Sequence, residues 1–126
     1  MAEKRNFVRI SKNIKVNFKV IIDKFANPGI PSNVSFTRSL SGNGMLLFSP
    51  KIIDIGTKLE LTLEIPDGND DGVDADGEVI GSNKLAENEF EIKIKFFDIN
   101  ETSRGRLVKY IMREDIKEKT QAKKKK

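Results

Sequence analysis

The chain has 126 residues, of which 37% are hydrophobic, and its formal net charge is +4. This length fits a single domain with a modest core, and a sequence with neither cysteine nor histidine excludes disulfides, thiolate metal sites and the most common general bases. No apolar run follows Met1 and no stretch approaches the roughly 18 apolar residues of a membrane span, so we expect a cytoplasmic protein without one.

Alternating apolar and polar residues predict six β-strands. A loop with two prolines and a glycine, residues 27–33, separates the first strand from the second, and the acidic turn-rich loop 66–72 separates the fourth from the fifth. The strands are expected at 14–22, 34–39, 45–48, 59–65, 73–80 and 90–96. Short strands at this regular spacing predict an all-β protein, a small six-stranded antiparallel barrel or sandwich covering residues 13–98.

The period changes after Asn100, where a helix is expected over residues 99–118. Asn100 or Thr102 is the candidate N-cap. The apolar stripe expected to pack on the barrel or across one of its mouths is Leu107, Val108, Ile111 and Met112, extended by Ile116. Residues 119–126 lack apolar periodicity and are expected to form a disordered basic tail.

Net charge is distributed unevenly along the sequence. It is +5 over residues 1–66, −8 over residues 67–91 and +7 over residues 92–126. The two basic regions favour an anionic partner, although a solvated surface explains charge alone.

Neither catalysis nor metal binding is expected. The acidic residues are concentrated in the loop 66–72, which we expect to be exposed. Carboxylates there are expected to keep ordinary pKa values and to make poor acid–base catalysts. The segment DDGVDADG resembles a calcium loop, but Gly72 stands at the first ligand position and Asn83 at the twelfth, where a bidentate carboxylate is required. We therefore expect no enzyme, no metal site and no cofactor.

Two polar segments remain as candidates for binding. RNFVR places the guanidinium groups of Arg5 and Arg9 near the start of the chain, and SLSGNG spans Ser39 to Gly44. Two hydroxyls alternate along the second segment and point to one side of a strand. Gly42, Asn43 and Gly44 then allow positive φ and close approach of a ligand, so that hydroxyl and N–H groups can cradle an anion.

Together, these two segments resemble the signature of the PilZ domain, the bacterial receptor for cyclic di-GMP. Its pattern is R-x-x-x-R, followed about thirty residues later by [D/N]-x-S-x-x-G. Ser41 and Gly44 match the second part, whereas Ser39 stands where the family usually has Asp or Asn. The resemblance extends from Lys4 to about Met112; the last strand reads EIKIKF where the family often has a glycine, a departure expected to matter little for binding.

The resemblance implies a PilZ-type β-barrel whose ligand is cyclic di-GMP. Arg5 and Arg9, on a flexible arm at residues 1–12, are expected to grip guanine and phosphate, because guanidinium forms paired donor contacts with both. Lys4 is expected to add a less directional charge. The family's Asp or Asn accepts hydrogen bonds from guanine, and Ser39 in that place is expected to weaken binding several-fold. The remaining expected contacts are Ser41, Gly42 and Gly44.

The function expected from this resemblance is a stand-alone monomeric receptor that binds cyclic di-GMP, orders its arm and signals to an effector protein in motility or biofilm regulation. Two alternatives stay open. A pI of 9.3 and a lysine-rich end suit a nucleic-acid-binding small barrel, although one tyrosine and no tryptophan offer few stacking platforms. The other alternative is a PilZ-like adaptor that has lost its ligand and binds only proteins, which Ser39 favours.

Overall fold

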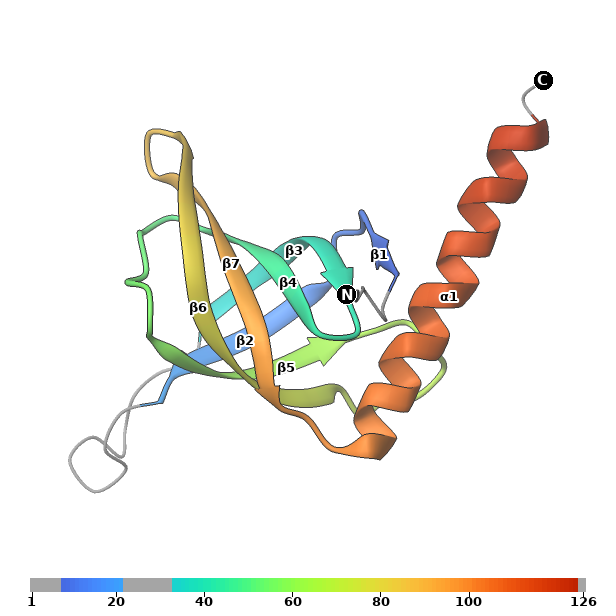
Figure 1. Cartoon of the computed structure of the whole chain (residues 1–126), viewed down its shortest axis with the longest axis horizontal. Helices are drawn as coiled ribbons and strands as arrows, with labels where there is room; N and C mark the ends of the chain where they lie inside the picture. Colours follow the sequence, from blue (N-terminus) through green and yellow to red (C-terminus); the bar gives the residue numbers. More distant parts are fainter. Residues whose placement is uncertain (1–7, 22–32, 125–126) are drawn as a thin grey trace, which may run out of the picture.

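The structure is a computed structural model and describes residues 8–21 and 33–124 (Figure 1). Its elements follow one another as seven strands and one helix. They are β1 (Arg9–Ile10), β2 (Lys15–Val20), β3 (Asn33–Ser41), β4 (Gly44–Ser49), β5 (Lys58–Glu64), β6 (Val73–Ala86), β7 (Glu89–Asp98) and α1 (Glu101–Lys124).

Six of the strands close into a ring. Antiparallel pairing runs from β3 through β2, β5, β6 and β7 to β4, and β4 pairs back onto β3. The short β1 adds to β3 beside this ring. Ring closure pairs each of these six strands with a neighbour on both sides over the buried part of the barrel. The predicted six-stranded antiparallel barrel with a C-terminal helix is confirmed.

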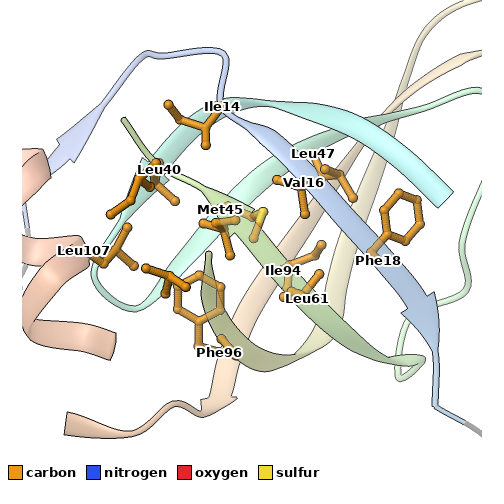
Figure 2. Close-up of a cluster of buried hydrophobic side chains, with 14 of the residues drawn as sticks. Ile14, Val16, Phe18, Leu40, Met45, Leu47, Leu61, Ile94, Phe96 and Leu107 are labelled. Carbon is orange, nitrogen blue, oxygen red and sulfur yellow. The ribbon is translucent and has the colours of Figure 1, made fainter. Parts of the chain in front are cut away.

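Alternation along each strand fills the inside of the barrel with apolar side chains (Figure 2). One cross-strand row shows the pattern: Leu40 of β3 pairs with Met45 of β4, which pairs with Ile94 of β7, which pairs with Val79 of β6. All four side chains are at most 2% exposed. Since neighbouring residues of a strand face opposite sides, the residues flanking this row point to the outside of the barrel.

The strands differ from the predicted ones mainly in length. β6 and β7 form a long hairpin that continues past the buried part, turning at Asn88 with φ of 58°. Its tip is exposed on both faces, so no apolar alternation marks it. β1 lies inside the segment predicted as an arm, because two residues are too few to give a periodic signal.

The helix α1 begins as predicted, with Asn100 as N-cap: its side-chain oxygen accepts a hydrogen bond of 2.8 Å from the N–H of Ser103. Leu107 and Ile111 are buried, but the third large buried residue is Tyr110, whereas the predicted Met112 and Ile116 are 51% and 61% exposed. The face that meets the barrel is thus rotated from the predicted stripe.

The helix also extends past the predicted end at residue 118, to Lys124. Its C-terminal half projects from the barrel (Figure 1), and i,i+4 ion pairing between Lys119 and Asp115 at 3.2 Å supports the helix there without apolar burial. No part of α1 is both long and apolar enough to cross a membrane.

Candidate ligand-binding face

Arg9 is held on the outside of the barrel by the two-residue strand β1. The neighbouring Ile10 pairs with Leu40 and is 2% exposed, which anchors β1 to the core. Arg9 therefore points outward, and its Nη1–H donates a hydrogen bond of 2.8 Å to Oγ of Ser39. This bond joins the two segments that the sequence singles out, thirty positions apart along the chain.

A β-bulge between Thr37 and Ser39 sets the direction of the serines. After the bulge, Leu40 enters the core and the two serines on either side of it face outward. Ser39 and Ser41 are nevertheless only 6% and 2% exposed. The segment before β2 is fixed to the same strand: the Thr37 hydroxyl accepts a bond of 2.9 Å from the Ile14 N–H and donates one of 2.6 Å to the carbonyl of Lys12.

The turn between β3 and β4 is held by Ser41. Its hydroxyl donates to Oδ1 of Asn43 at 2.7 Å and accepts from the Asn43 N–H at 3.3 Å. The carbonyl of Asn43 in turn accepts a bond of 2.9 Å from the Phe96 N–H. The Ser41 hydroxyl therefore supports the shape of the turn, and its expected contact with a ligand stays a prediction.

Gly44 is required by close packing. A Cβ at this position would clash with the carbonyl oxygen of Ile94 on the neighbouring strand. Its φ is not in the left-handed region that a glycine would allow, and the close approach seen in the structure is that of the neighbouring strand; the expected approach of a ligand stays a prediction. Gly42 lies buried in the turn beside it. Lys4 and Arg5 lie outside the described residues.

Two cations that the sequence reasoning missed extend this face. Gly44 pairs with Lys95, and Leu46 pairs with Lys93, both on β7. The two lysines flank the buried Ile94 and are exposed on the outside of the barrel. The alternation of Phe90, Ile92, Ile94 and Phe96 already turns them outward, but only the register shows that Lys95 lies opposite Gly44 and Lys93 opposite Leu46.

The helix is fastened by two ion pairs. Arg106 donates to both carboxylate oxygens of Asp67, at 2.9 and 3.1 Å, which lowers the pKa of Asp67 from 3.8 to about 2. Lys12, three residues after Arg9, reaches Glu114 at 3.3 Å. Burial opposes ionisation of Glu114, but hydrogen bonds from Lys117 and Lys12 outweigh it and lower its pKa.

A cavity of about 140 Å³ lies beside the first of these pairs, lined by Asp67, Asn69, Arg106, Lys109, Tyr110 and Arg113. It is well below the roughly 300 Å³ at which small-molecule sites begin. On the face that carries Arg9, the arginine is exposed whereas Ser39, Ser41, Gly42 and Gly44 are buried. Within the residues that the structure describes, no group of three or more acidic side chains is arranged to hold a metal ion.

The fold and this face define a small closed barrel that presents arginine, lysine and a glycine-lined turn on one outer surface. A protein-family model described as the PilZ domain matches residues 3–113. The chain belongs to the PilZ domain family.

Several solved structures have a similar fold. The Bacillus subtilis inhibitor of motility MotI/DgrA aligns with a TM-score of 0.75 at 13% identity, covering 92% of this chain and 53% of that one. YcgR from Escherichia coli in complex with c-di-GMP aligns at 0.67 with 15% identity, covering 98% and 51%. The PilZ domain of YcgR with c-di-GMP aligns at 0.62 with 15% identity, covering 94% and 98%.

The chain spans about half the length of MotI/DgrA and of the full YcgR chain. No curated protein matches the sequence.

Proposed function

We propose that this protein is a cyclic di-GMP receptor whose ligand lies on the face formed by β1, β3 and β4, and that it passes the signal to a partner protein. The observation that carries the proposal is the 2.8 Å hydrogen bond from Arg9 to Ser39, because it brings the arginine of one motif segment onto the other. Membership of the PilZ family supports the choice of ligand, as do two similar structures that hold c-di-GMP.

The chemistry of the face suits this ligand. Cyclic di-GMP offers two phosphodiesters and two guanines, and a guanidinium group forms paired hydrogen bonds with phosphate or with O6 and N7 of guanine. Arg9 is exposed while its partner Ser39 is buried, so the arginine is oriented without being shielded from a ligand. Arg5 and Lys4 precede it in the sequence and add positive charge to the same arm. We propose no catalytic role for any of these groups.

Titration calorimetry with cyclic di-GMP tests the binding. We expect the wild type to bind with a Kd in the micromolar range, which corresponds to about −8 kcal/mol. Arg9→Ala and Arg5→Ala should each weaken binding at least tenfold, because each removes a charged hydrogen-bond donor. Arg113→Ala removes an equal charge from an exposed position on α1 and should leave affinity within about twofold. A wild type that gives no heat at high micromolar ligand overturns the proposal.

The same titration separates the alternatives. A nucleic-acid-binding barrel would bind single-stranded DNA in place of cyclic di-GMP, with affinity that collapses steeply between about 50 and 200 mM salt. A ligand-free adaptor would bind neither.

The proposed signal is ordering of the N-terminal arm over the ligand, which changes the surface that a partner meets. Hydrogen exchange at residues 3–12 should slow when cyclic di-GMP is added. Unchanged exchange there, in protein shown by calorimetry to be saturated, would rule out this mechanism while leaving the binding intact.

A further inference from the structure

The outer surface beside Arg9 is organised in cross-strand rows. The core row of Leu40, Met45 and Ile94 is drawn in Figure 2. One residue further along each strand, the outward row begins at Arg9 of β1. It continues through Ser41 of β3, Gly44 of β4 and Lys95 of β7, each paired with the one before.

Gly44 leaves a gap in this row. It carries no side chain, and the clash that a Cβ would make with the Ile94 carbonyl keeps it so. The row therefore has an exposed side chain at Arg9, a buried hydroxyl at Ser41, a buried glycine without a side chain at Gly44 and then the exposed side chain of Lys95. Adjacent strands lie about 4.8 Å apart. The Cα atoms of Ser41 and Lys95, which lie on either side of Gly44, are therefore separated by about 10 Å.

On β6, Lys95 pairs in register with the acidic Glu78, whereas its neighbour Lys93 pairs with Gly81. Neither forms an ion pair with a carboxylate among the described residues. By contrast Arg38 on β3 is tied to Glu91 at 2.9 Å. The four-carbon stem of lysine is flexible and lets the ammonium group of Lys95 lean back over Gly44 toward Arg9.

We propose that Lys95, with Lys93 beside it, is the second cationic contact of the ligand site and binds the phosphodiester that Arg9 does not reach. The proposal rests on the proposed function. It places the two phosphates at opposite ends of the outward row, one at Arg9 on β1 and the other at Lys95 on β7. A ligand with two phosphodiesters engages both ends, whereas one with a single phosphodiester engages one. Lys95 thus selects for a cyclic dinucleotide over a cyclic mononucleotide.

The test compares lysine variants in calorimetric titrations with cyclic di-GMP and with cyclic GMP. Lys95→Gln should weaken cyclic di-GMP binding about five- to twentyfold, since a charged hydrogen bond is lost. Lys93→Gln should have a smaller effect in the same direction. Lys95→Arg keeps the charge and should stay within about threefold of the wild type. The preference for cyclic di-GMP over cyclic GMP should fall in Lys95→Gln.

Lys84→Gln is the matched control. Lys84 also lies on the exposed outside of the β6–β7 hairpin, but it pairs in register with Phe90, about 16 Å along the strand from Lys95, and it is ion-paired with Glu87. The Lys84→Gln variant should bind cyclic di-GMP with the same affinity as the wild type. If Lys95→Gln and Lys84→Gln bind equally well, the inference is wrong although the proposed function stands. If the wild type itself does not bind, the proposed function has failed first.

Discussion

At the scale of the residue, Ser39 orients the guanidinium group of Arg9 by accepting a hydrogen bond from it. Its hydroxyl is a neutral acceptor for the guanidinium at 2.8 Å, and it is almost fully buried. A carboxylate in the same place would form a charge-assisted bond, which is typically about twice as strong. It could also accept hydrogen bonds from the guanine edge.

Substitution at Ser39 should therefore change affinity in both directions. We expect Ser39→Asp to tighten cyclic di-GMP binding about three- to tenfold, and Ser39→Ala to weaken it about threefold, because Arg9 loses its acceptor. Calorimetry on both variants checks this, with circular dichroism to establish that each is folded. Equal affinities for Ser39→Ala and the wild type would show that the observed hydrogen bond has no part in binding.

Gly44 also acts locally, but its predicted effect is on the stability of the fold. Gly44→Ala should lower the free energy of unfolding by about 1–3 kcal/mol, because the new Cβ meets the Ile94 carbonyl and the strands must shift. Gly105→Ala is its control, since an added Cβ at that helical position meets nothing within 4 Å beyond the adjoining residues and backbone of its own helix and alanine is the better helix former by up to about 1 kcal/mol. Urea denaturation should thus give opposite signs. A Gly44→Ala protein as stable as the wild type contradicts the packing argument.

At the scale of the element, the sequence predicts those strands that bury one face and expose the other to solvent, because their apolar and polar residues alternate. The alternation from Leu59 to Ile65 matches β5 closely, and the core-facing part of β7 follows the alternation of Phe90 to Phe96. The sequence cannot predict the hairpin tip, which is formed by backbone pairing without burial, or β1, whose two residues are too few to give a periodic signal. The helix face is also missed, because Tyr110 packs inward while Met112 is left exposed, and only the docked barrel distinguishes them.

The candidate site divides in the same way. Motif spacing identifies Arg9, Ser39 and Gly44 as neighbours, and the structure brings them to one face. Lys93 and Lys95 were not predicted, because their place depends on which strand β7 pairs with and in which register. Those are long-range choices made by the whole sheet, and no local pattern near residue 95 records them.

The attachment of α1 to the loop between β5 and β6 should depend on pH. Hydrogen bonding to Arg106 lowers the pKa of Asp67 to about 2 in the folded protein, below its ordinary 3.8. A lowered pKa means that the pair stabilises the fold fully above about pH 4 and that this contribution is lost as the pH falls toward 2. Asp67→Asn should be less stable than the wild type by about 1–2 kcal/mol at pH 7.

Urea denaturation of the two proteins at several pH values measures this difference. It should shrink below pH 4 and approach zero near pH 2, where the wild-type carboxyl is also losing its charge. A difference that stays constant between pH 7 and pH 2.5 would show that Asp67 acts through its shape and not through its charge.

At the scale of the whole molecule, the closed ring limits where a ligand can cause movement. The pairing of β3 with β4 completes the barrel, so opening it would break a ladder of backbone hydrogen bonds. The chain before β2 and the helix α1 lie beside the ring and can shift without opening the pairing of β3 with β4. They are joined to each other by the ion pair between Lys12 and Glu114 at 3.3 Å, in which the glutamate side chain is only 13% exposed.

This ion pair predicts that ligand binding at Arg9 is felt in the helix. On addition of cyclic di-GMP, amide exchange should slow over residues 8–12 and also over residues 107–116, while β5 and β6 stay unchanged. Glu114→Gln removes the charge that ties the helix to Lys12, so the helix response should be lost although Kd changes by no more than about twofold. Glu118→Gln, an exposed acid one turn further along α1, should respond like the wild type. A helix response that persists in Glu114→Gln would mean that the signal reaches α1 through the packed face of Leu107, Tyr110 and Ile111 instead.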